Sequence, residues 1–357
     1  MATRPARSQR KSPKPSRTIR GSAKKTPCYV ITGAAGFIGS ALAYRLNELG
    51  HDNLILVDAL GTDARWKNLV PLRYADYVDR DDFLEGVRGG RFDKAGIAAV
   101  FHLGACSSTT EADAAFLLKN NFEYTKVLAQ WCAGMKKPAR FIYASSAATY
   151  GDGALGYADN HEMVASLRPL NAYGYSKQLF DQWALRNGLL KGAGGAVGLK
   201  YFNVYGPNEY HKGDMKSMVA KAHAQILAEG SVKLFRSHRP DYRDGEQKRD
   251  FLHVLDAVDM TLHFLDPRAP GGLYNVGTGE ARTWIDMMRA VFAAMGREPR
   301  IDFIEMPEVL RGKYQYYTKA DIAKIRAAGY KKPIRSLEQG VAEYVAYLDK
   351  DERVLGW

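Results

Sequence analysis

The sequence predicts an α/β fold, a doubly wound parallel sheet joined to a smaller α/β domain. Short runs of continuous apolar residues recur along the chain, as in CYVIT at 28–32 and LILVD at 54–58. Helical periodicity fills the intervals between these runs, and a glycine-rich turn follows the first run directly. Strands that are apolar on both faces and alternate with helices are typical of a parallel sheet covered on both sides.

The expected elements follow one another in a regular order. Strands are expected at 28–32, 54–58, 98–105, 140–146, 197–206 and 273–277, and helices at 39–50, about 112–134, about 174–190 and 251–265. Residues 206–250 are polar and basic with few strand signals, so we expect a smaller domain to begin there. We assign 28–205 and 251–278 to the sheet-containing domain, and 206–250 and 279–350 to the smaller domain.

The basic charge of the chain is concentrated at its start. Of the net charge of +12, residues 1–27 contribute nine Lys and Arg without any Asp or Glu, which leaves 12 − 9 = +3 for the remainder. This segment has almost no large apolar side chains, so we expect a basic disordered tail. Adhesion to acidic surfaces and an organelle transit peptide are the alternatives. Because the remainder is only weakly basic, we expect no nucleic-acid partner.

Composition also limits the cellular setting. No apolar run approaches the ~18 residues that a transmembrane helix needs. The three cysteines (Cys28, Cys106, Cys132) have scattered spacings that fit neither a disulfide framework nor a zinc site. We therefore expect a cytoplasmic protein that has no metal site and no membrane span.

Residues 33–39 read GAAGFIG and lie between the first strand and the following helix. Gly33 would form the tight turn, and Gly36 would let the backbone approach a pyrophosphate. Gly39 would let helix and strand pack closely. Asp58 ends the second strand, where a carboxylate can bind the adenosine ribose. Together these features predict a Rossmann-type dinucleotide site.

The choice between NAD and NADP is open at this point. Asp58 favours an unphosphorylated ribose, whereas a 2′-phosphate requires a nearby cation. Arg65 and Arg80 are candidates for that cation, and both could equally be ordinary surface arginines.

A second group of residues predicts acid/base chemistry. Ser146 ends the strand 140–146, where a hydroxyl can reach a ligand beyond the carboxyl edge of the sheet. In NAYGYSKQ (171–178), Tyr173 and Lys177 are four residues apart and share a helix face, while Tyr175 points elsewhere. A free tyrosine has a pKa of about 10, so we expect Lys177 to lower that of Tyr173.

These motifs resemble the extended short-chain dehydrogenase/reductase superfamily, and within it the ADP-L-glycero-D-manno-heptose 6-epimerase family. The matching segments include GAAGFIGS, FHLGACSSTT, YASSAATYG, NAYGYSKQLFD, YFNVYGPNEYHKGDM, KRDF and GKYQYYTKADI, in the same order over nearly all of 28–347. The resemblance implies epimerisation at C6″ of ADP-D-glycero-D-manno-heptose, by oxidation to a ketone and re-reduction with tightly bound cofactor. It further implies NADP, with NAD possible, a homopentamer, and a place in lipopolysaccharide inner-core heptose synthesis.

The resemblance also assigns roles to individual residues. Tyr173, Lys177 and Ser146 match the catalytic group, with Lys212 as a second acid/base. Cofactor contacts are implied for Gly33, Gly36, Phe37, Ile38, Gly39, Asp58, Arg65, Arg80, Leu103, Gly104, Ala105, Cys106, Ser107, Asn120, Lys177 and Val204, and substrate contacts for Asn203, Lys212, Asp214, Lys221, Phe235, Arg249 and Tyr314. Asp214 replaces a family serine, Lys221 aligns with a family histidine, and segment 236–248 is longer than in shorter members.

Two alternatives concern the mechanism and the class of protein. Lys212 could transfer a proton on the second face of the substrate, or it could only pair with the substrate diphosphate. The chain could instead be another nucleotide-sugar epimerase or a 4,6-dehydratase. Ala147 and Ala148 stand where a dehydratase carries an Asp-Glu pair, which counts against the latter. A catalytically silent dinucleotide-binding regulator would usually lack the Tyr/Lys pair.

Overall fold

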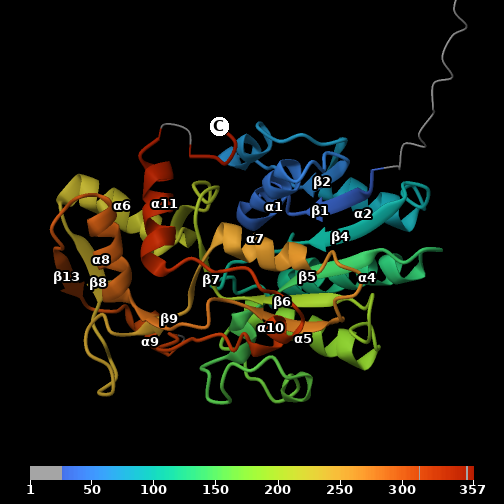
Figure 1. Cartoon of the computed structure of the whole chain (residues 1–357). Helices are drawn as coiled ribbons and strands as arrows, with labels where there is room; N and C mark the ends of the chain where they lie inside the picture. The colour runs from blue at the N-terminus through green and yellow to red at the C-terminus, as the bar shows by residue number, and fades with distance from the viewer. Residues whose placement is uncertain (1–25, 313, 351–352) are drawn as a thin grey trace, which may run out of the picture.

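The protein is described by a computed structural model that covers residues 26–312, 314–350 and 353–357 (Figure 1). The expected basic tail at 1–27 lies almost entirely outside the described residues. None of the helices within the described ranges combines the length and the apolar character needed to cross a membrane.

A seven-stranded parallel sheet forms the centre of the molecule. Its strands are β1 Cys28–Thr32, β2 Leu54–Asp58, β3 Asp76–Asp79, β4 Ile97–His102, β5 Arg140–Ser146, β6 Val197–Tyr201 and β11 Gly272–Val276. The strand order is β11-β6-β5-β4-β1-β2-β3, and neighbouring strands are parallel throughout. The chain winds outward from β1 in both directions, which confirms the predicted fold class.

Helices cover both faces of this sheet. The α-helices of the described chain are α1 Phe37–Glu48, α2 Arg80–Arg88, α3 Ala114–Leu117, α4 Tyr124–Gly134, α5 Ala172–Arg186, α6 Met218–Glu229, α7 Val254–His263, α8 Trp284–Ala294, α9 Glu308–Arg311, α10 Ala323–Ala327 and α11 Leu337–Leu348. Apolar residues of α1 and α7 pack in one core, and those of α2, α4 and α5 pack in another. The sheet is therefore buried on both sides, as its continuous apolar strands require.

The later part of the chain builds a third core beside the sheet, at the left of Figure 1. Helices α6, α8 and α11 pack there against the parallel pair β8 Val232–Phe235 and β13 Ile301–Ile304. Two further pairs join this region to the sheet: parallel β7 Asn203–Tyr205 with β10 Phe251–His253, and antiparallel β9 Lys248–Arg249 with β12 Arg282–Thr283. The division into two domains remains a prediction.

Several predicted boundaries are wrong for identifiable reasons. The strand predicted at 98–105 ends at His102, because the chain then leaves the sheet. The strand predicted at 197–206 breaks at Phe202 into β6 and β7, and β7 pairs with β10 outside the main sheet. That pairing also makes the first three residues of the helix predicted at 251–265 a strand. The edge strand β3 was not expected, because its sequence DYVD is largely polar.

Candidate active site

A cavity of about 790 Å³ lies at the carboxyl edge of the parallel sheet. Thr32, Asp58, His102, Ser146 and Tyr201 are the last residues of β1, β2, β4, β5 and β6, and all five line it. Carboxyl ends of parallel strands are where open α/β sheets bind ligands. The cavity is therefore placed by the topology of the sheet.

The glycine loop forms one wall and leaves no room for a side chain at Gly33 or Gly39. Gly33 has a φ of +69°, and a Cβ there would lie 2.7 Å from the backbone nitrogen of Gly104. A Cβ at Gly39 would lie 2.0 Å from the Gly33 carbonyl oxygen. Helix α1 begins next to the cavity, and its N-cap Gly36 provides no side-chain cap. The first N–H groups of α1 are thus free to bind a pyrophosphate, so this wall fits a dinucleotide.

The end of β2 brings an acid and two arginines to the cavity. The Asp58 carboxylate accepts two backbone N–H hydrogen bonds of 2.8 Å, which oppose the rise in its pKa caused by burial. Arg65 Nη1 lies 3.8 Å from Asp58 Oδ1, and the same guanidinium pairs with Asp63 at 2.7 Å. Arg80 donates to Asn120 at 3.2 Å. This end can hold a ribose and carries positive charge for a phosphate.

All the positions predicted to contact the cofactor line this one cavity. They are Gly33, Gly36, Phe37, Ile38, Gly39, Asp58, Arg65, Arg80, Leu103, Gly104, Ala105, Cys106, Ser107, Asn120, Lys177 and Val204. The segment Leu103 to Ser107 reaches the cavity because the chain leaves β4 at His102.

Helix α5 presents Tyr173 and Lys177 to the same cavity. Its N-cap Asn171 accepts a 2.8 Å hydrogen bond from the Gly174 N–H group, which fixes the first turn. A Cβ at Gly174 would lie 2.7 Å from the Ala148 carbonyl oxygen, so this turn packs directly on the segment after Ser146. Tyr175 is 48% exposed and is not in the cavity wall, which confirms the predicted orientation of the two tyrosines.

Burial is the largest cause of the pKa shifts of Tyr173 and Lys177. It raises the pKa of Tyr173, against a hydrogen bond with Ser146 that lowers it. It lowers the pKa of Lys177 to about 8, against the Asp181 carboxylate that raises it. The expectation that Lys177 would bring the Tyr173 pKa below its ordinary value is therefore wrong for the protein alone. Desolvation of the phenol raises this pKa by more than the polar contacts of the hydroxyl lower it.

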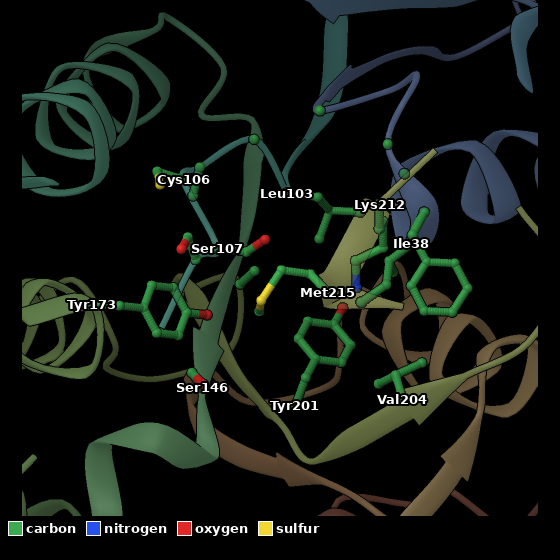
Figure 2. Close-up of a pocket in the computed structure, with 18 of the residues that line it drawn as sticks. Ile38, Leu103, Cys106, Ser107, Ser146, Tyr173, Tyr201, Val204, Lys212 and Met215 are labelled. Carbon is green, nitrogen blue, oxygen red and sulfur yellow. The ribbon is translucent and has the colours of Figure 1, made fainter. Parts of the chain in front are cut away.

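Lys212 lies on the other side of the cavity. Figure 2 shows Tyr173 and Ser146 at one side and Lys212 at the opposite side, with Met215 and Tyr201 between them. The Lys212 ammonium lies over the Phe37 ring, 5.2 Å from its centroid. Burial lowers the pKa of Lys212, and the Glu209 carboxylate opposes that shift.

The predicted substrate residues divide into two groups. Asn203 and Lys212 line the cavity, whereas Asp214, Lys221, Phe235, Arg249 and Tyr314 do not. The buried Arg249 guanidinium lies over the rings of Tyr314, at 5.1 Å, and Trp284, at 5.9 Å. Trp284 lines the cavity and donates a 2.9 Å hydrogen bond to Tyr314, so this cationic cluster lies directly behind the wall.

Sequence reasoning missed a buried polar network beneath the site. The Asp181 carboxylate accepts from Tyr143 at 2.9 Å, Ser145 at 2.7 Å and Lys200 at 2.9 Å. Lys200 also donates to Thr149 at 2.7 Å. The network ties α5 to β5, to β6 and to the short 3₁₀ helix Ala147–Tyr150. The spacing of Asp181, four residues after Lys177 on the same helix, was the available signal. Sequence reasoning also missed the lining residues Tyr201, His211, Met215, Trp284 and Met287.

The site contains basic, hydroxyl and aromatic groups in place of a metal-binding set. Among the residues that the structure describes, no three His, Cys, Asp or Glu side chains gather as ligands for a metal ion. The three cysteines are free thiols.

A model of the NAD dependent epimerase/dehydratase family matches residues 29–277. The chain belongs to this family. It is similar to an ADP-L-glycero-D-manno-heptose-6-epimerase of Nitratidesulfovibrio vulgaris, with 55% identity over 89% of this chain and 96% of the relative. Its structure is similar to that of the Helicobacter pylori ADP-L-glycero-D-manno-heptose-6-epimerase, with a TM-score of 0.75, 29% identity and coverage of 91% and 96%. A Thermus thermophilus UDP-glucose 4-epimerase complex with NAD gives a TM-score of 0.70, 26% identity and coverage of 90% and 99%.

Proposed function

We propose that this chain of the NAD dependent epimerase/dehydratase family inverts C6″ of ADP-D-glycero-D-manno-heptose to give ADP-L-glycero-D-manno-heptose. The observation that carries the proposal is the placement of acid/base groups on opposite sides of one cavity, Tyr173 with Ser146 on one side and Lys212 on the other. The names and the extent of the similar relatives support the heptose substrate. Ala147 and Ala148, where a 4,6-dehydratase carries acids, weigh against that alternative.

The reaction at an unactivated carbinol carbon requires removal of hydride, because no neighbouring carbonyl can stabilise a carbanion. A nicotinamide dinucleotide bound along the glycine loop supplies the acceptor and, in reverse, the donor of that hydride. Tyr173 would take the hydroxyl proton while Ser146 orients the hydroxyl. Lys177 would hold the nicotinamide ribose.

The ketone must then present its other face before it is reduced, so the new hydroxyl points away from Tyr173. Lys212 lies on that side and would protonate the oxygen there. Burial lowers its pKa, which makes the ammonium a stronger proton donor than a lysine in water. A role limited to clamping the substrate diphosphate is the second possibility for Lys212.

The direct test is conversion of the purified heptose nucleotide, followed by NMR. Tyr173→Phe keeps the ring and removes the hydroxyl, so the rate should fall by about 10² or more. Tyr175→Phe is the matched control and should retain the wild-type rate, because Tyr175 is exposed. A Tyr173→Phe enzyme of wild-type rate would contradict the assignment.

Lys212→Met separates the two roles of Lys212. Loss of a diphosphate clamp alone raises KM and leaves kcat unchanged. Loss of the second acid/base group should abolish single-turnover hydride transfer from one C6″ epimer and spare the epimer that Tyr173 serves. Equal loss from both epimers would contradict the two-base mechanism.

We further propose NADP as the cofactor, with Arg65 and Arg80 at its 2′-phosphate. Both arginines line the cavity, and Arg65 lies close to Asp58 at the ribose position. Arg65 is also paired with Asp63, a half-exposed partner that a phosphate could replace. Mass spectrometry of the cofactor released on denaturation decides between NADP and NAD.

The assembly and setting are proposed on resemblance alone: a cytoplasmic homopentamer that serves synthesis of the lipopolysaccharide inner core. Sedimentation analysis of the purified chain tests the pentamer. A monodisperse monomer or dimer at micromolar concentration would exclude it.

A further inference from the structure

The loop that carries Lys212 is closed by a buried carboxylate. Glu209 is 1% exposed and lies at the start of this loop. One of its carboxylate oxygens accepts from the Ser217 N–H group at 2.7 Å, and the other accepts from the Ser217 hydroxyl at 2.5 Å. Ser217 is the N-cap of α6, so the carboxylate joins the two ends of segment 209–217 and lies at the positive end of that helix.

The same loop is tight at the position of Lys212. The Lys212 N–H group donates to the Glu209 carbonyl at 3.0 Å, and the Met215 N–H group donates to the Lys212 carbonyl at 2.9 Å. The lysine stem therefore leaves the backbone from a fixed turn, and its ammonium reaches the ring of Phe37 on the glycine loop.

We propose that Glu209 is the positioning residue for Lys212: its buried carboxylate closes segment 209–217 and supplies the negative charge that faces the lysine. The inference rests on the proposed function, because it concerns the group that acts on the second face of the substrate. Lys212 itself remains the catalytic residue, and Glu209 acts only through it.

The polar groups around Glu209 favour the ionised form of its carboxyl group and oppose the effect of burial. Ser217 at the start of α6 and the Tyr344 hydroxyl of α11 donate hydrogen bonds to the Glu209 carboxylate. This is expected for an ionised carboxylate, which can only accept hydrogen bonds. These donors and the charge of Lys212 counteract the effect of burial, which raises the pKa of Glu209.

Within the part of the chain that the structure describes, Glu209 is the acid whose charge acts on Lys212. His211 directly precedes the lysine, and burial and nearby cations lower the pKa of its imidazole to about 4, so it is neutral at pH 7. Loss of the Glu209 charge would therefore leave the desolvation of Lys212 unopposed, and the amine would become neutral at lower pH.

The experiment compares the full-length holoenzyme with Glu209→Gln, Glu209→Asp and the control Glu229→Gln. Glu229 is an acid of the same region that pairs with Lys233 on the surface. The first readout is acetylation of Lys212 by acetic anhydride over a range of pH, followed by peptide mass spectrometry, because only the neutral amine reacts. In Glu209→Gln the midpoint for Lys212 should fall by about one pH unit, an ordinary effect of one neighbouring charge. Glu209→Asp and Glu229→Gln should keep the wild-type midpoint.

The second readout is single-turnover hydride transfer from each C6″ epimer. Glu209→Gln should slow hydride transfer from the epimer that reacts on the Lys212 side by at least about 10-fold, the effect of roughly one neighbouring charge. The rate for the epimer that reacts on the Tyr173 side should change by less than about 3-fold. Equal slowing of both epimers, or an unchanged Lys212 midpoint in Glu209→Gln, would overturn the proposal. If Glu209→Gln does not fold, a Glu209→Asp midpoint that differs from wild type would overturn it, because that variant keeps the charge.

Failure of the underlying function gives a different result. If the wild-type holoenzyme converts neither epimer, the proposed function fails, while the acetylation midpoints still test whether Glu209 sets the charge of Lys212.

Discussion

Lys177 should make the cofactor-free protein less stable than a variant without its charge. Lys177 is 5% exposed, and burial lowers its pKa from 10.5 to about 8. At about 1.4 kcal/mol per pH unit, this difference corresponds to about 3 kcal/mol of unfolding free energy. Lys177→Met keeps most of the stem and removes the charge, so we expect the variant to be about 2–3 kcal/mol more stable at pH 7 while its epimerase activity is lost.

The sign of the pH dependence follows from the direction of the shift. The folded protein binds the Lys177 proton more weakly than the unfolded chain does, so the destabilisation is complete below about pH 8. As the pH rises from about 8 towards 10.5, the unfolded chain retains protons that the folded protein has lost, and the difference between the two proteins should disappear. Urea unfolding at several pH values measures it. A wild-type protein more stable than Lys177→Met at pH 7, or a difference independent of pH, would refute this reasoning.

Two further predictions concern the buried network and the tail. Asp181→Asn leaves the Lys200 ammonium buried without an anion, so the unfolding free energy should fall by about 3–5 kcal/mol. Asp181→Leu combined with Lys200→Met should recover only part of this loss, because the buried hydroxyls of Tyr143 and Ser145 lose their acceptor. A loss below about 1 kcal/mol in urea unfolding of Asp181→Asn would show that the pair is not essential. Deletion of residues 1–26 should leave the activity and the melting temperature unchanged, because the segment has almost no apolar side chains; a large loss of either would show that the tail packs on folded protein.

The cofactor part of the site was predictable because its motifs are local. The turn at Gly33, the acid at the end of β2 and the tyrosine and lysine of α5 each follow from spacing within one strand–helix unit. The order of parallel strands then brings these units to one edge of the sheet. Spacing therefore identified these positions, whereas Leu103 to Ser107, Asn120 and Val204 were expected at the cofactor only from the family resemblance.

The opposite wall was not predictable in this way. Trp284 and Met287 come from α8, far along the chain, and their place in the cavity depends on how the third core packs against the sheet. Arg249 was expected at the substrate but lies behind Trp284. The two residues are far apart in the sequence, so no local motif predicts this contact. Breaks such as the one at Phe202 depend on the distant partner strand β10.

The two deeply buried lysines near the site show how structural and functional charges differ. Lys200 is 1% exposed and has Asp181 at 2.9 Å, so the chain itself compensates its burial. Lys177 is 5% exposed and feels Asp181 only at longer range, and its pKa is lowered to about 8. Among the described residues no carboxylate pairs with Lys177, so its desolvation is left for a ligand to offset. The hydroxyls of a nicotinamide ribose in the cavity would accept hydrogen bonds from this ammonium, which would favour its charged form. Binding of the dinucleotide should therefore raise the pKa of Lys177, and a Lys177 signal that titrates identically with and without cofactor would show that the lysine does not touch it.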